Sequence, residues 1–333
     1  MTNTVKTLIA LLGIQAVIIL WVNRAQKETI VDTNKPLIAL DFATLDKIVV
    51  STSEKESCEI VRKENSWSLP AYYDFPASSE KVTELFKAFS ELKESWPAGK
   101  TLLAAKQFLT TAEKFEKKFD LYKDGKLLQT VYIGNSPSFK KVHIRVEGNE
   151  KTYIGSFSSY EYASKASSWA NQSLYGVAKS DLVSFEKDNL QLVAKEETKT
   201  FEWVDLQASE KMNDSETSLL INAAINPRFE KVLGKDSYAV GEKSFSYTLK
   251  LKTGDSIQYE FFKPLKKEDK EEKKEEKAKQ ESLVLKVSKY PYYFGVSSSE
   301  VTDIINLDRK QLLQNESEQE SKTISLNEDK VAE

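Results

Sequence analysis

The chain has very few residues of the types that support disulfide, metal or nucleophilic chemistry. Its 333 residues include one cysteine, Cys58, and one histidine, His143. One cysteine cannot form a disulfide within the chain, and a zinc site built from cysteine and histidine needs four ligands. Both residues lie in stretches with the alternating pattern of strands, which favours packing roles. We therefore assign no catalytic, cofactor-binding or metal-ligating residue.

Glycine and proline are also scarce, with 11 and 8 residues, which excludes a collagen-like chain. The glycine-rich signatures of dinucleotide and ATP binding are absent from the sequence, as is the G-x-S-x-G nucleophile elbow. Acidic residues are so numerous that no pair of carboxylates stands out as a hydrolytic pair. The sequence therefore predicts a protein that is not an enzyme and does not bind ATP itself.

Neither sign of charge dominates, since 48 basic and 51 acidic residues give a net charge of −3. This balance gives no support for a nucleic-acid partner. Apolar residues make up 40% of the chain and include 16 Phe, 14 Tyr and 5 Trp, enough to bury a core. The length suggests two domains.

The longest apolar stretch is near the N-terminus, over residues 7–22, and carries no charge. As a helix it would be about 24 Å long, just under the usual length of a bilayer-spanning segment. We expect an uncleaved transmembrane anchor over residues 1–24 that contacts membrane lipid. A cleaved signal peptide and a buried soluble helix remain alternatives, and flanking charges barely decide the orientation. The anchor residues that we single out are Thr7, Leu12, Ile19, Trp21 and Val22.

The remainder of the chain shows the hydrophobic patterns of short strands and a few helices. Asp124 and Gly125 separate two alternating runs and predict a hairpin. Apolar residues at helical spacing predict a helix that opens near Ser79, and a weaker pattern suggests another over residues 158–175. A run of alternating lysines and acids over residues 263–282 predicts a charged hairpin insertion.

Several motifs recur in the same order in the second part of the chain. Trp67 and Trp203 are separated by the same number of positions as Glu80 and Glu216. We interpret this as an internal duplication. The expected fold class is α+β, with a single transmembrane helix followed by two similar halves of antiparallel strands with packed helices. The expected boundaries are an anchor (1–24), a linker (25–37), two repeat units (38–176 and 177–307) and a polar tail (308–333).

Two groups of tyrosines are candidates for a binding surface, because tyrosine combines apolar area with a polar tip. Packing of alternate rings into the core is the competing interpretation. The candidate residues are Tyr160, Tyr162, Tyr290, Tyr292 and Tyr293.

The order of the motifs resembles the bacterial domain-of-unknown-function 4340 family over about residues 5–307. The motifs that carry the resemblance are LDKIVVS, EIVRKENSWSLP, DLYKDGKLLQTVYIGN, TYIGSF, WANQSLYGV and DLVSFEKDNLQLVAKEE. The resemblance implies a single-pass envelope protein that accompanies ABC-type transport systems of the gliding-motility kind, next to a permease and an ATPase. It also implies a body outside the cytoplasmic membrane, and it carries no catalytic residues. The charged insertion departs from the usual pattern of the family.

We therefore expect a membrane-anchored, non-catalytic accessory subunit of an envelope ABC-type transport system. It would sit in the inner membrane with its body in the periplasm or outside the cell. The alternative is a stand-alone module that binds an envelope polymer or ligand through exposed aromatic residues. A hydrolase that uses two facing carboxylates is a third hypothesis.

Overall fold

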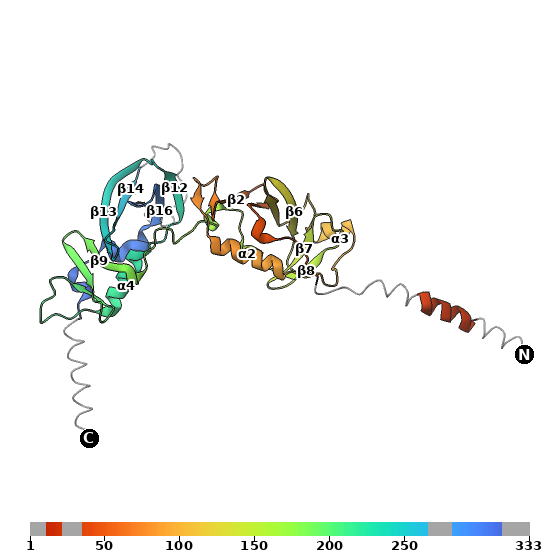
Figure 1. Cartoon of the computed structure of the whole chain (residues 1–333), viewed down its shortest axis with the longest axis horizontal. Helices are drawn as coiled ribbons and strands as arrows, with labels where there is room; N and C mark the ends of the chain where they lie inside the picture. The colour runs from red at the N-terminus through yellow and green to blue at the C-terminus, as the bar shows by residue number, and fades with distance from the viewer. Residues whose placement is uncertain (1–10, 22–34, 266–281, 315–333) are drawn as a thin grey trace, which may run out of the picture. The chain divides into compact units, whose positions relative to one another are not determined.

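The structure is a computed structural model, and it describes residues 11–21, 35–265 and 282–314. Contacts divide the chain into two compact units (Figure 1). The first contains residues up to Trp67 and residues 79–169, and the second contains residues 68–78 and those from Ala170 onward. Thr7 and Val22 of the expected anchor, most of the expected linker, residues 266–281 of the charged insertion and most of the tail lie outside the described residues.

The first sheet has eight strands in the order β4-β3-β2-β1-β5-β6-β7-β8. Residues 68–78, which include the end of β3 and all of β4, make most of their contacts with the second unit. The strands are β1 (Lys47–Thr52), β2 (Ser57–Lys63), β3 (Ser66–Leu69), β4 (Phe75–Pro76), β5 (Lys117–Lys123), β6 (Lys126–Ile133), β7 (Lys141–Val146) and β8 (Tyr153–Ser156). The α-helices of this part are α2 (Ser79–Glu91) and α3 (Leu102–Gln107).

The second sheet also has eight strands, in the order β11-β10-β9-β13-β14-β15-β16-β12. They are β9 (Leu182–Lys187), β10 (Leu190–Ala194), β11 (Phe201–Trp203), β12 (Lys231–Lys235), β13 (Val240–Leu251), β14 (Ser256–Pro264), β15 (Ser282–Val287) and β16 (Tyr292–Ser297). The α-helices are α4 (Asp214–Ile225) and α5 (Thr302–Ile305).

Seven strands and one helix of each unit correspond in chain order and in position within the sheet. When β1, β2 and β3 are matched to β9, β10 and β11, and β5–β8 to β13–β16, the two sheets have the same strand order. Helix α2 follows the third of these strands in the first unit, as α4 does in the second (Figure 1). The unmatched strands β4 and β12 lie at sheet edges.

Each long helix contributes an apolar stripe to the core of its unit. On α2, Val82, Leu85 and Phe89 are buried, and the Phe89 ring meets the Phe119 ring of β5 edge-on at 5.2 Å. On α4, the buried residues are Thr217, Leu220, Ile221 and Ala224, which follow helical spacing. Leu219 of the same helix is exposed.

The hairpin between β5 and β6 forms because its turn residues accept left-handed backbone angles. Asp124 and Gly125 have φ of 51° and 73°, and Gly254 in the corresponding turn between β13 and β14 has φ of 88°. Glycine reaches such angles without steric cost, and aspartate tolerates them better than most residues. The turns thus fix the pairing of the central strands in both sheets.

The expected fold class is wrong. The described chain is mostly two antiparallel sheets with few helices, and the predicted helix over residues 158–175 is replaced by two short 3-10 turns, Ser159–Glu161 and Ala166–Ser168. No described helix combines the length and hydropathy needed to cross a bilayer. The described N-terminal helix covers residues 11–21. This finding overturns the single-pass anchor and the inner-membrane location inferred from it.

Candidate functional site

The two candidate tyrosines of the first unit differ in exposure. Tyr160 lies in a 3-10 turn and is 67% exposed. Tyr162 is buried, because its ring stacks on Phe157 at 5.3 Å and lies 5.9 Å from Trp169. Burial raises the pKa of the Tyr162 hydroxyl to about 12. Only Tyr160 of this pair is therefore available to a ligand.

In the second unit, Tyr292 and Tyr293 follow each other on β16 and so face opposite sides of the sheet. Tyr292 is buried against Phe75, with ring centroids 4.9 Å apart, and its hydroxyl donates to the carbonyl oxygen of Asp74 at 3.3 Å. The pKa of Tyr292 is raised, chiefly by burial and further by the charges of Asp74 and Asp236. Tyr292 is therefore a core residue that holds the residue 70–75 segment against β16.

Tyr293 faces the other side of the sheet and takes part in a partly exposed cluster. Lys286 on β15 is directly opposite Tyr293, and its ammonium lies 4.6 Å from the centroid of the Tyr293 ring. The same ammonium donates to the carbonyl oxygen of Tyr290 at 2.8 Å. Tyr238 stands beside Tyr293, with ring centroids 5.8 Å apart and an angle of 37° between the rings. We call Tyr238, Tyr290, Tyr293 and Lys286 the tyrosine–lysine patch.

The position of Tyr238 depends on a glycine on the neighbouring edge strand. Gly234 of β12 pairs with Tyr293 across the ladder, after a register shift. A Cβ atom at this position would lie 3.2 Å from the Tyr238 ring and 3.3 Å from the carbonyl oxygen of Ser237. The turn is also held by a hydrogen bond from the Asp236 amide to the Pro291 carbonyl, at 2.6 Å. Glycine thus leaves the space in which the Tyr238 ring packs beside Tyr293.

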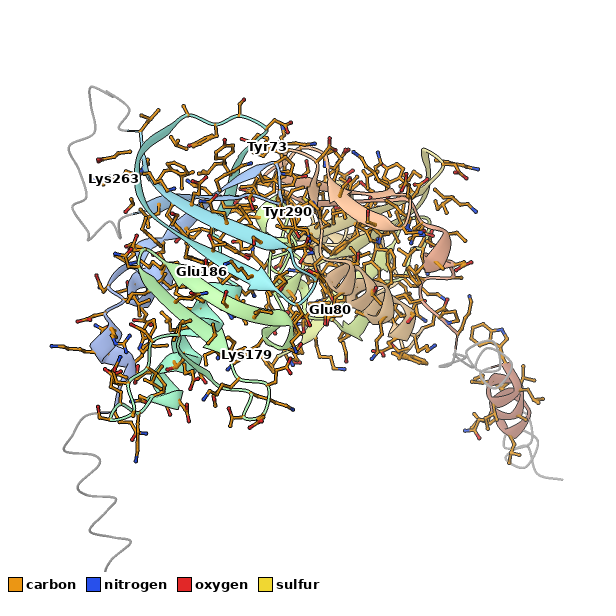
Figure 2. All side chains as sticks on the ribbon, turned by 60° about the vertical axis from the view of Figure 1, so that its left-hand side comes forward. Tyr73, Glu80, Lys179, Glu186, Lys263 and Tyr290 are labelled. Carbon is orange, nitrogen blue, oxygen red and sulfur yellow. The ribbon has the colours of Figure 1, made fainter. Side chains whose placement is uncertain are left out.

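The segment between β3 and β4 presents two further tyrosines in the second unit. Tyr73 and Asp74 are consecutive non-glycine residues with φ of 61° and 55°. The Tyr72 hydroxyl accepts a hydrogen bond from the Val232 amide of β12 at 2.6 Å, so the segment is fixed to the strand that carries Gly234. Figure 2 labels Tyr73 on this segment and Tyr290 just before β16. The left-handed conformation keeps Tyr73 exposed at a strain cost of about 1–2 kcal/mol per residue.

The charge on the patch comes from Lys286. Partial burial lowers its pKa, and the nearby carboxylate of Asp236 acts in the opposite direction. An ammonium has three N–H donors, of which the Tyr290 carbonyl uses one. The patch therefore offers aromatic faces next to a cationic hydrogen-bond donor, a combination suited to binding rather than to proton transfer.

A second polar cluster lies on the same sheet and is satisfied internally. Glu186 on β9, labelled in Figure 2, accepts hydrogen bonds at one carboxylate oxygen from Ser184, Gln191 and Lys250, at 3.2, 2.8 and 2.7 Å. These contacts join β9 to both of its neighbouring strands. Their evident role is to stabilise the sheet. Within the described residues, no three His, Cys, Asp or Glu side chains are grouped so that they could hold a metal ion.

The single histidine and the single cysteine of the chain, His143 and Cys58, are both buried. His143 on β7 donates from Nδ1 to the carbonyl oxygen of Asn135 at 2.9 Å, and its ring stacks on Phe108 at 4.1 Å. Cys58 on β2 has its pKa raised to about 12, mainly by burial and also by the charge of Glu59. A thiol with so high a pKa is a poor nucleophile at neutral pH.

The sequence pattern found part of the patch and missed the rest. It singled out Tyr290 and Tyr293 but also the buried Tyr292, and it did not include Tyr238 or Lys286. Alternation along β16 shows that one of Tyr292 and Tyr293 must face outward, but not which one. The pairing of β12 with β16 brings Tyr238 close to Tyr293. No pattern within either stretch of sequence predicts this pairing.

The described residues of the expected anchor are exposed. Leu12, Ile19 and Trp21 lie in the helix over residues 11–21. Thr7 and Val22 lie outside the described part of the chain.

Comparison with known proteins finds one family. No curated protein matches the chain significantly, and no solved structure does. The model of a domain of unknown function, DUF4340, matches residues 67–290, which is more than half of the chain and runs from β3 in the first sheet to just before β16 in the second. The chain therefore belongs to the DUF4340 family.

Proposed function

We propose that this protein is a non-catalytic binding protein and that its tyrosine–lysine patch is the binding surface. The observation that carries the proposal is the packing of Tyr238 beside Tyr293, with the Lys286 ammonium over the Tyr293 ring. Tyrosine gives a large, rigid contact area at low entropic cost, because it has only two side-chain torsions. Lys286 adds a donor and a positive charge, so the preferred ligand has flat apolar faces and an acidic group.

An acidic sugar polymer has this chemistry. The apolar faces of sugar rings can stack on tyrosines, and a uronate carboxylate can accept a charge-assisted hydrogen bond from Lys286. We further propose that the protein serves as the binding subunit of an ABC-type transport system, in which a separate subunit hydrolyses ATP. This role is suggested by the family resemblance of the sequence, and the sequence has no ATP-binding motif of its own.

Affinity electrophoresis in gels that contain polygalacturonate, with dextran as the neutral polymer, tests the binding surface. We expect Tyr293→Ala to weaken polygalacturonate binding about tenfold or more, as for a central aromatic of an interface. Lys286→Met should reduce the preference for the acidic polymer over dextran. Gly234→Ala should weaken binding without removing an aromatic ring, because the new Cβ displaces Tyr238.

Tyr160→Ala is the matched control, because Tyr160 is an exposed tyrosine of the first unit. It should bind polygalacturonate as the unsubstituted protein does. Equal losses in the Tyr160 and Tyr293 variants would show that the patch is not the binding surface. The role in transport is tested by affinity purification from the native host with mass spectrometry. That role predicts co-purification of an ABC-type permease and ATPase, and recovery of neither would contradict it.

A further inference from the structure

The first unit carries an exposed apolar surface that is separate from the tyrosine–lysine patch. Trp96, Leu102 and Leu103 are 68, 65 and 78% exposed. They lie within eight consecutive positions, on the loop before α3 and on its first turn. We call these three residues the Trp96 ledge. Single exposed apolar residues are common, but a large aromatic and two leucines together indicate an interaction surface.

The ledge is held rigidly by the backbone around it. The amide of Ala98 donates to the Thr152 carbonyl at 2.8 Å, and the amide of Thr152 donates to the Gly99 carbonyl at 2.9 Å. The Thr101 hydroxyl caps α3 by accepting from the Ala104 amide at 3.2 Å. These hydrogen bonds tie the loop to the segment before β8 and cap α3. They therefore fix the outward direction of Leu102 and Leu103.

Three lysines lie in the same stretch of sequence as the ledge, and Glu147, Glu150 and Lys151 line a pocket together with one of them, Lys100. Lys93, Lys100 and Lys106 are exposed, and the Lys100 ammonium lies 5.4 Å from the centroid of the Trp96 ring. The nearest acid in the sequence, Glu94, is paired with Lys35 at 2.9 Å. Tryptophan and lysine beside exposed leucines are the residues found where proteins meet the headgroup region of a bilayer.

The exposed N-terminal helix is connected to the unit beside this ledge. The Glu94 amide donates to the carbonyl of Lys35 at 2.8 Å, and the Leu37 amide donates to the carbonyl of Leu92 at 2.9 Å. The chain therefore enters the first unit beside Glu94, which is two residues before Trp96 in the sequence. The helix over residues 11–21 is joined to Lys35 by residues 22–34, which span at most about 45 Å. The large apolar side chains of this helix are exposed. Like the ledge, the helix therefore needs an apolar surface against which to bury them.

We propose that the Trp96 ledge docks on an anionic lipid surface. Trp96, Leu102 and Leu103 enter the boundary between headgroups and acyl chains, and Lys93, Lys100 and Lys106 contact lipid phosphates. Such contact lies in the plane of the membrane and needs no helix that crosses it. A lipid surface is favoured over a second copy of the chain, because it satisfies the apolar side chains of the ledge, the three nearby lysines and the tethered apolar helix together.

The test uses the full chain with one label on the ledge. Cys58 is buried and its pKa is raised to about 12, so a thiol-reactive fluorophore labels an introduced Leu103→Cys selectively. Vesicles of phosphatidylcholine with phosphatidylglycerol should shift the fluorescence to the blue and raise its intensity severalfold. Pure phosphatidylcholine vesicles should give a weaker response, because each lysine contributes less without anionic lipid. Leu219→Cys on α4, an exposed leucine of the second unit, is the matched control and should show no shift.

The substitutions Trp96→Ser, Leu102→Ser and Leu103→Ser together should lower vesicle binding about tenfold or more. Val204→Ser with Leu219→Ser, which changes exposed apolar residues of the second unit, should have little effect. The proposal is overturned if the chain does not bind vesicles, or if it binds them while the Leu103→Cys label stays in water. A blue shift that depends on protein concentration and not on vesicles would assign the ledge to self-association instead.

Discussion

Single side chains of the first unit show how strongly its core depends on aromatic packing. Phe89 on α2 is fully buried and contacts the Phe119 and Phe157 rings, at 5.2 and 5.4 Å between centroids. Phe89→Ala should lower the free energy of unfolding by about 3–5 kcal/mol, from lost burial and the cavity that remains. Urea unfolding followed by circular dichroism measures this change.

Phe139→Ala is the control for this prediction, because Phe139 is 84% exposed. It should change the free energy of unfolding by less than about 0.5 kcal/mol. Similar destabilisation by the two substitutions would mean that Phe89 does not form part of the packed core.

The candidate site illustrates what residue types can and cannot predict. Tyrosine content drew attention to the stretch before and within β16. The exposure of each ring depends on which face of the sheet the helix covers, and this depends on packing far away in the sequence. Lys286 escaped attention because a lone lysine in an alternating strand is ordinary. Only its position opposite Tyr293 gives it significance.

At the scale of elements, the two glycine turns should contribute alike to their hairpins. Gly125 and Gly254 have φ of 73° and 88°, and nothing lies within 4 Å of a Cβ atom built at either position. Gly125→Ala and Gly254→Ala should therefore each destabilise the protein by about 1–2 kcal/mol through backbone strain alone. Thermal unfolding measures the loss.

Asparagine variants at the same two positions separate backbone strain from other effects. Asparagine tolerates the left-handed region better than alanine, so Gly125→Asn and Gly254→Asn should lose less stability. Equal losses for alanine and asparagine would show that strain at positive φ is not the cause.

Local patterns predicted elements well where one signal was strong. Asp124 and Gly125 marked a hairpin, and the spacing of Val82, Leu85 and Phe89 marked α2. The pattern over residues 158–175 failed because the chain forms only two short 3-10 turns there, and Tyr162 and Trp169 are buried against each other outside them. The short strand β12 has no clear alternation of its own and forms by pairing with β16. The N-terminal segment was expected to cross a bilayer, but no described helix is long and apolar enough to do so.

For the molecule as a whole, the buried tyrosines of the second unit predict how stability responds to alkaline pH. Their hydroxyls donate to backbone carbonyls: Tyr175 to Pro227, Tyr247 to Ala224 and Tyr259 to Tyr175, at 2.7, 2.8 and 2.7 Å. Burial raises the pKa of all three well above the ordinary value of 10. In the unfolded chain the same groups ionise near pH 10.

A group whose pKa is raised in the folded state contributes stability below its unfolded pKa and loses it as the pH rises further. Each of the three tyrosines should therefore reduce the free energy of unfolding by about 1.4 kcal/mol per pH unit above pH 10. Guanidinium unfolding between about pH 9 and 11.5 measures the slope, and tyrosinate absorbance should appear together with loss of structure. Tyr247→Phe should make the slope shallower. An unchanged slope in that variant would exclude Tyr247 as a source of the alkaline instability.

The matching strand order has a practical consequence for any study of ligand recognition. The six-residue strands β7 and β15 have the same burial pattern, and Arg145 and Lys286 are the fifth residues of these strands, which makes Arg145 the counterpart of Lys286. Arg145 is engaged by the Thr110 carbonyl and Glu147, and it covers the Tyr132 ring. The first sheet therefore serves as an internal reference for the second, because its equivalent cation, Arg145, is already occupied by partners within the chain. A ligand that binds the second sheet through Lys286 can be tested against the first sheet in the same molecule.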